Sequence, residues 1–245
     1  MDVGLLGITS LAVFLATVFQ AVAGFGYAIV GVPILSPILG PKAAVIFLLI
    51  SGTYMRGSML YMLRKQVSFA RIKNFFAGAL IGVVPGGLVL KSVSVATLNI
   101  ILGATLILAV TLLSCHLRWE TKHKTWEQIA FGVVGGFFTA ATGVGGPPLA
   151  LYMLNAQKDK QEARTDLIFY FVICNCWTLL SGLVIGNVAW QDFVGLPLWT
   201  LPAAFLGMWV GEKIFHRINQ HLFNRIALLA ILLSGLTMLY KGVSL

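Results

Sequence analysis

Long apolar runs, separated by short charged stretches, extend along the whole chain. Eight apolar segments can be distinguished, at residues 3–38, 43–63, 75–90, 95–117, 126–154, 167–188, 193–210 and 222–240. About 20 apolar residues suffice for a helix to cross a bilayer. Composition agrees, because 58% of the 245 residues are hydrophobic and only 10% are charged, whereas soluble domains are about 25% charged. The pattern predicts an all-α polytopic membrane protein.

The first and fifth segments are too long for one crossing, and each is interrupted by glycine. The interruptions are Gly24-Phe25-Gly26-Tyr27 and Gly143-Val144-Gly145-Gly146-Pro147, which correspond when the sequence is shifted by 119 residues (143 − 24). Glycine and proline do not continue a helix readily. A broken backbone is tolerated at membrane depth only where protein or a water-filled cavity covers it. Two matched breaks therefore predict a binding site near the middle of the membrane.

The basic residues indicate how the segments are threaded. If every segment crosses once, each membrane face receives eight Lys and Arg residues, and neither orientation is preferred. If the first and fifth segments go in and return, one face receives 13 and the other three, namely Lys42, Lys91 and Lys241, with Arg56 inside a span. Because positive charge favours the cytoplasmic side, this threading predicts a cytoplasmic basic face and places both termini in the periplasm.

The same threading divides the chain into two halves of opposite orientation. We expect a first repeat at 1–117, a cytoplasmic linker at 118–125 and a second repeat at 126–245. Each repeat would contain a broken or re-entrant hairpin followed by three transmembrane helices, as in transporters built from inverted-topology repeats. A shift of 125 residues supports the division, since it places Gly82 on Gly207 and Gly86 on Gly211.

The glycine stretches resemble a known family. Ala21-x-x-Gly24-Phe25-Gly26 near the N-terminus and Thr142-Gly-Val-Gly-Gly-Pro-Pro148 after a central basic loop are similar to those of the sulfite exporter TauE/SafE family, also called TSUP. The resemblance covers nearly the whole chain. It implies a bacterial inner-membrane transporter that moves sulfur-containing anions such as sulfite, sulfoacetate or other organosulfonates.

Such an anion needs hydrogen-bond donors and positive charge, without competing carboxylates. The candidate substrate-binding residues are therefore the glycines and prolines of the breaks, the aromatic residues beside them, and polar residues at predicted membrane depth: Gln20, Gly24, Phe25, Gly26, Tyr27, Thr53, Arg56, Thr139, Thr142, Gly143, Gly145, Gly146, Pro147 and Asn175. The glycines can instead serve close helix packing. The polar residues can bond a neighbouring helix, and Arg56 can extend to the headgroups.

We expect export by alternating access, with an importer, a channel or a structural subunit of a membrane complex as alternatives. The sequence shows no Ser/His pair, carboxylate pair or metal-ligand cluster at predicted depth, so we expect no enzyme activity, metal or cofactor. The net charge of +9 reflects topology rather than nucleic-acid binding, because no long basic run exists. The expected partners are a small sulfur-containing anion and the lipid bilayer, and homo-oligomerisation is left open.

Overall fold

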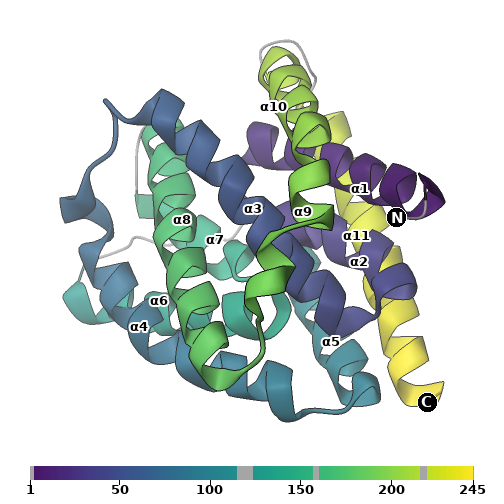
Figure 1. The fold of residues 1–245 in the computed structure, drawn as a ribbon. Helices are drawn as coiled ribbons and strands as arrows, with labels where there is room; N and C mark the ends of the chain where they lie inside the picture. The colour runs from purple at the N-terminus through teal and green to yellow at the C-terminus, as the bar shows by residue number, and fades with distance from the viewer. Residues whose placement is uncertain (1–2, 115–123, 157–159, 216–219, 245) are drawn as a thin grey trace.

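The computed structural model describes residues 3–114, 124–156, 160–215 and 220–244, so most of the predicted linker 118–125 lies outside the described residues. All regular elements of these ranges are helical (Figure 1). They are α1 (Val3–Ala23), α2 (Tyr27–Leu39), α3 (Pro41–Leu63), α4 (Phe69–Ser92), α5 (Val95–Ser114), α6 (Thr125–Thr142), α7 (Gly146–Ala156), α8 (Lys160–Ile185), the 3-10 turn η1 (Trp190–Phe193), α9 (Leu196–Trp199), α10 (Leu201–Phe215) and α11 (Gln220–Ser244).

Several helices are long and apolar enough to cross a membrane. Within the described residues five qualify, in α1, α3, α4, α5 and α8, and a sixth is formed if the bent pair Trp190–Trp199 and Leu201–Lys213 is counted as one span. The two parts of that pair meet at 56°. The protein is therefore an all-α, multi-pass membrane protein, as the hydrophobic pattern predicts.

The glycine breaks divide the first and fifth apolar segments into helix pairs. In the first segment, α1 ends before Gly24 and α2 begins after Gly26, both of which have positive φ. In the fifth segment, α6 ends at Thr142 and Gly143 follows with a φ of 73°. The returning helices α2 and α7 have 13 and 11 residues, or about 20 and 17 Å. Both are shorter than the membrane core of about 30 Å.

Helices from the two halves pack against one another in a reciprocal pattern. Four of the extensive pairs are α4 with α6, α1 with α10, α5 with α11, and α3 with α8; the pair α4 with α8 is also extensive, and its counterpart α3 with α10 is much smaller. When the halves are matched in chain order, α1 corresponds to α6, α3 to α8, α4 to α10 and α5 to α11. Under this correspondence the pair α4 with α6 becomes the pair α1 with α10, and the pairs α5 with α11 and α3 with α8 are each converted into themselves. The glycine contacts match as well, because a Cβ added at Gly82 would meet the carbonyl oxygen of Val133, and one at Gly207 would meet that of Phe14. In Figure 1, α3 runs between a group containing α4, α6 and α8 and a group containing α1, α10 and α11.

Three element boundaries differ from the hydrophobic pattern. Helix α4 begins at Phe69 rather than 75, and α8 begins at Lys160 rather than 167. Both helices continue through charged residues, and several of these, including Arg71, Arg164 and Asp166, are paired with charges on other helices, as described below. The expected segment 193–210 is broken into η1, α9 and α10. Gly195 there has a φ of 87° and precedes a proline-started turn, which bends the chain.

Candidate anion-binding site

Arg56 lies in the core of the helix bundle rather than at a membrane surface. It sits on α3 seven residues before the helix ends, and only 5% of it is exposed. Its guanidinium carbon lies 5.6 Å from the centroid of the Tyr27 ring and 5.4 Å from that of Phe171. In the described part of the chain no carboxylate lies within ion-pair distance of Arg56, and its Nε has no hydrogen-bond partner. The side chain is therefore packed inside the bundle.

Gln20 spans the first break and connects it to Arg56. Its Nε2 donates to the carbonyl oxygen of Gly24 at 2.7 Å, while its Oε1 accepts from the amide of Tyr27 at 3.1 Å. The same Oε1 accepts from Arg56 Nη2 at 3.4 Å. The amide of Gln20 therefore replaces helical hydrogen bonds that the break removes. One of the two N–H groups of its amide and its Oε1 are used within the protein, so Gln20 positions the break.

Tyr27 begins α2 and holds its ring beside Arg56. Its hydroxyl lies 3.0 Å from Ser51 Oγ, and Ser51 Oγ itself donates to the carbonyl oxygen of Phe47 at 2.8 Å. Because Ser51 has one proton, Tyr27 is the donor of the first bond. A Cβ at Gly52 would come within 3.0 Å of both Arg56 Nη1 and the Tyr27 ring. Gly52 thus leaves the space in which the guanidinium lies.

The two breaks contact one another. A Cβ added at Gly143 would lie 3.2 Å from Ala28 Cβ in the first turn of α2. A Cβ added at Gly146 would lie 3.2 Å from the Phe25 ring, which is buried between the breaks. The first turn of a helix leaves amides without intrahelical acceptors and carries partial positive charge. The start of α2 therefore lies close to the second break, and the buried Arg56 lies beside Tyr27 at the start of α2.

The second break is stabilised by hydroxyl groups. Thr139 Oγ1 donates to the carbonyl oxygen of Gly135 at 2.7 Å. Thr142 Oγ1 donates to that of Phe138 at 2.7 Å and accepts from the amide of Val144 at 3.1 Å. Both hydroxyl protons are used within the protein.

The glycines of the second break have different roles. Of Gly143, Gly145 and Gly146, only Gly143 has a positive φ. A Cβ at Gly145 would overlap the Thr139 hydroxyl, so Gly145 is required for close approach and not for a left-handed turn. Helix α7 starts at Gly146, with Pro147 in its first turn, where the missing amide costs nothing.

Two further candidates, Asn175 and Thr53, bond the same carbonyl group of α3. Asn175 is buried on α8, and its Nδ2 donates to the carbonyl oxygen of Leu49 at 3.5 Å. Leu49 precedes Gly52, beside which the Arg56 guanidinium lies, by three residues on α3. Thr53 Oγ1 donates to the same carbonyl at 2.7 Å, and Thr53 lines a hollow on the other side of α3 with Tyr54 and Phe205. Thr53 is thus not brought to the breaks.

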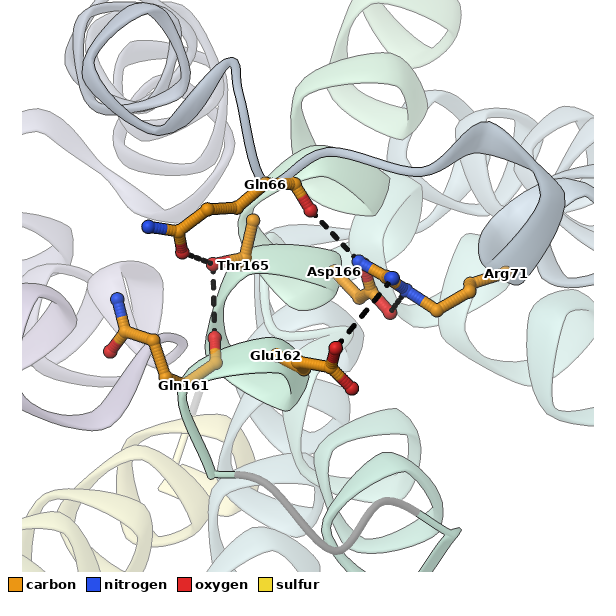
Figure 2. Close-up of polar contacts among 6 residues, drawn as sticks. All are labelled: Gln66, Arg71, Gln161, Glu162, Thr165 and Asp166. Atoms are coloured by element: carbon orange, nitrogen blue, oxygen red, sulfur yellow. Dashed lines mark hydrogen bonds and ion pairs between the residues drawn. The ribbon is translucent and has the colours of Figure 1, made fainter.

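A second polar cluster, at the starts of α4 and α8, contains paired charges (Figure 2). Arg71 Nε donates to Asp166 Oδ2 at 2.6 Å, and Arg71 Nη2 donates to Asp166 Oδ1 at 2.9 Å. Asp166 is fully buried, whereas the Arg71 side chain is 34% exposed. The same Nη2 also donates to the carbonyl oxygen of Gln66. Arg71 Nη1 lies 4.0 Å from Glu162 Oε1. This bidentate pair connects the two halves of the chain.

A third arginine, Arg164, also has a carboxylate partner. Its Nη2 lies 2.7 Å from Glu212 Oε2 on α10. A Cβ at Gly24 would be 2.9 Å from Arg164 Cγ, so this side chain packs directly against the first break. Reasoning from sequence missed both ion pairs and Gly52, because partners far apart in the chain are not visible in the hydrophobic pattern. The available signals were Asp166 immediately before the apolar segment 167–188 and a small residue four positions before Arg56.

The geometry suits a small anion. A buried cation without a counter-charge is costly, by several kcal/mol, and an anion that entered would offset that cost. The helix starts at both breaks would contribute partial positive charge. Aromatic rings close the space around the guanidinium, and Arg56 is almost completely shielded from solvent. An anion could therefore reach it only if helices move apart.

Comparison with known protein families identifies the family of this chain. The family model described as Sulfite exporter TauE/SafE matches residues 9–238, which is nearly the entire chain and includes both breaks and Arg56. No curated protein and no solved structure matches.

Proposed function

Because the chain belongs to the sulfite exporter TauE/SafE family, whose members are membrane transporters of sulfur anions, we propose that it exports sulfite, sulfoacetate or another small organosulfonate by alternating access. The observation that carries the proposal is Arg56, a cation buried beside the first break, with no carboxylate partner among the described residues. In this proposal the anion is the missing partner of Arg56. Gln20 and Tyr27 position the guanidinium, and the starts of α2 and α7 supply further positive potential.

Two observations support alternating access over an open channel. Arg56 is 5% exposed, so the arrangement is closed around it. The helix pairs exchange when the halves 1–117 and 126–245 are matched, as expected if the halves are inverted repeats that move against one another. The Arg71–Asp166 pair joins the halves at one end of the bundle and would have to separate when that end opens. The proposed orientation places this end in the cytoplasm and both termini in the periplasm of the inner membrane.

The proposed direction is outward. A membrane potential that is negative inside favours anion exit by about 2.3 kcal/mol per charge for each 100 mV. Export needs no coupling ion under these conditions. The carboxylates Asp166 and Glu212 are each paired with an arginine. The potential is therefore the proposed driving force.

Flux measurements in proteoliposomes test the proposal. Radiolabelled sulfite or sulfoacetate is loaded inside, and efflux is measured at a series of clamped potentials with the wild type, Arg56→Gln and Arg64→Gln. Arg64 is the control because it is an exposed arginine just beyond the same helix. We expect efflux that increases with inside-negative potential, is lost in Arg56→Gln and is retained in Arg64→Gln. Wild-type efflux in Arg56→Gln would refute the site, and stimulation by a proton gradient at fixed potential would refute the driving force.

A further inference from the structure

A second polar hollow lies far from Arg56, at the opposite end of α3. It has a volume of about 460 Å³ and lies between α2, α5 and α11. Its polar lining consists of Ser36, Asn99, Ser234, Thr237 and Lys241. We refer to it as the Lys241 hollow. Pro41 at the first turn of α3 also lines it and lies 15 residues before Arg56, which is about 22 Å along the helix.

Two side chains in the Lys241 hollow are buried without a hydrogen-bond partner. Ser36 is 7% exposed, and its Oγ has no partner within the described residues. This is unusual in this protein, where Ser51 and Thr105 donate to the carbonyl four residues earlier. Asn99 is also 7% exposed and has no side-chain hydrogen bond within the described ranges, although its amide atoms, unlike Ser36 Oγ, are not fully buried. Since buried polar groups normally find partners, both are available to a molecule in the hollow.

Lys241 differs from the two other lysines at this end of the bundle. Lys42 donates to the carbonyl oxygen of Lys91 at 2.9 Å, and Lys91 in turn donates to the carbonyl oxygen of Ile185. Both ammonium groups thus neutralise the carboxyl end of a helix. Lys241 borders the hollow, and its ammonium group has no acceptor or carboxylate partner among the described residues. Its charge is therefore available to a ligand.

The charge around the Lys241 hollow favours an anion. Helices α3 and α5 begin here and present partial positive charge, while α2 and α11 end here and present partial negative charge. These contributions oppose one another, so the formal charge of Lys241 decides the sign. None of the residues that line the hollow is acidic. Walls formed by Pro33, Pro37 and Met238 leave apolar surface beside the donors, which suits a ligand with both an anionic and a hydrocarbon part.

We propose that the Lys241 hollow is a second anion site, which binds a sulfonate, sulfite or phosphate group through Lys241, Asn99 and Ser36. All three side chains can donate to the same oxyanion, and Ser36 and Asn99 gain the partners they lack. The group belongs either to the transported anion as it enters or leaves at this end, or to a phospholipid headgroup. The inference extends the proposed function, but the two can fail separately, because the hollow and Arg56 are lined by different residues.

Binding stoichiometry tests this proposal. The full chain is placed in nanodiscs of phosphatidylcholine alone or with phosphatidylglycerol, and radiolabelled sulfoacetate binding is measured by equilibrium dialysis. In phosphatidylcholine we expect the wild type to bind two equivalents, and Lys241→Gln and Asn99→Leu to bind one. In both variants the affinity of the Lys241 hollow should fall by about tenfold at least. Thr237→Val is the matched control, because Thr237 lines the hollow but already donates to the carbonyl oxygen of Leu233 at 2.8 Å. It should bind two equivalents.

The lipid arm distinguishes the two sources of the anionic group. If a headgroup occupies the hollow, phosphatidylglycerol removes one sulfoacetate equivalent from the wild type, and the phospholipid retained on detergent extraction falls in Lys241→Gln. If neither sulfoacetate binding nor retained phospholipid changes in Lys241→Gln and Asn99→Leu, the proposal is wrong. Arg56→Gln serves as the separate check. Loss of the other equivalent there supports the proposed function, and retention of both overturns it without affecting the Lys241 hollow.

Discussion

Arg56 and Arg71 belong to the same half of the chain but are neutralised in different ways. Arg71 forms a bidentate pair with Asp166, which is fully buried, and remains one-third exposed itself. Arg56 is buried and contacts two aromatic rings and the Gln20 amide oxygen, with no carboxylate partner in the described ranges. The first arrangement is complete within the protein. The second leaves a charge to be neutralised by a ligand.

This difference separates a structural charge from a functional one. Breaking a buried pair is destabilising because it leaves the partner charge uncompensated. Removing a buried charge that has no partner relieves a desolvation cost instead. Substitution of the two arginines by the same apolar residue should therefore affect stability in opposite directions. Transport should be lost when Arg56 is replaced, although this replacement does not destabilise the fold.

The largest expected effect is that of Arg56→Met on transport. We expect sulfur-anion flux to fall about a hundredfold, since a charge-assisted contact of about 3 kcal/mol is lost. The ligand-free protein should melt at a higher temperature than the wild type, because an uncompensated buried charge has been removed. Flux in proteoliposomes and thermal unfolding in detergent measure both effects. A variant that is less stable and still transports would contradict our interpretation of Arg56.

Arg71→Met should give the reverse result. We expect the free energy of unfolding to fall by about 3 kcal/mol, because Asp166 would remain buried without its arginine. The double variant Arg71→Met with Asp166→Leu should regain most of that loss, since both charges are then absent. Chemical unfolding in detergent provides the measurement. If the double variant is as unstable as the single one, the pair does not account for the effect.

A third test alters the backbone that presents Tyr27 to Arg56. Gly26 has a φ of 96°, and a Cβ there would also overlap the Phe19 ring. Gly26→Ala should cost about 2 kcal/mol of stability and reduce anion affinity through displacement of the Arg56 surroundings. Gly7→Ala is the matched control, because no atom lies within 4 Å of a Cβ placed there. Equal stability of the two variants would show that the first break is not constrained.

The smallest expected effect is that of Tyr27→Phe. The substitution removes the hydroxyl that donates to Ser51 but keeps the ring beside Arg56. We expect a loss of about 1 kcal/mol in stability and nearly unchanged maximal flux. Tyr27→Leu, which also removes the ring, should lower anion affinity further. Thermal unfolding and flux titrations compare the two variants. A complete loss of flux in Tyr27→Phe would instead indicate that the hydroxyl contacts the substrate.

Much of the fold could be predicted from the apolar pattern, whereas the surroundings of the candidate residues could not. Membrane crossing depends on local hydrophobicity, and helix breaks at Gly24 and Gly143 follow from the conformational freedom of glycine. The bend before α10 was not predicted, because it depends on how η1 and α9 pack on α3. Asp166 lies next to the end of a predicted segment, and its burial, which the sequence does not show, becomes favourable only because Arg71, 95 positions away, reaches it.

The sequence by itself determined that this protein is an all-α membrane protein with two matched glycine breaks and one arginine inside a span, because these properties follow from composition and local backbone preferences. The tertiary structure alone decided which arginines have carboxylate partners. It brought Phe171 and Tyr27 around Arg56, joined Arg71 to Asp166, and left Lys241 beside the unpartnered Asn99 and Ser36. The physical reason is that the cost of a buried charge depends on its neighbours in space. Those neighbours are contributed by helices far apart in the chain.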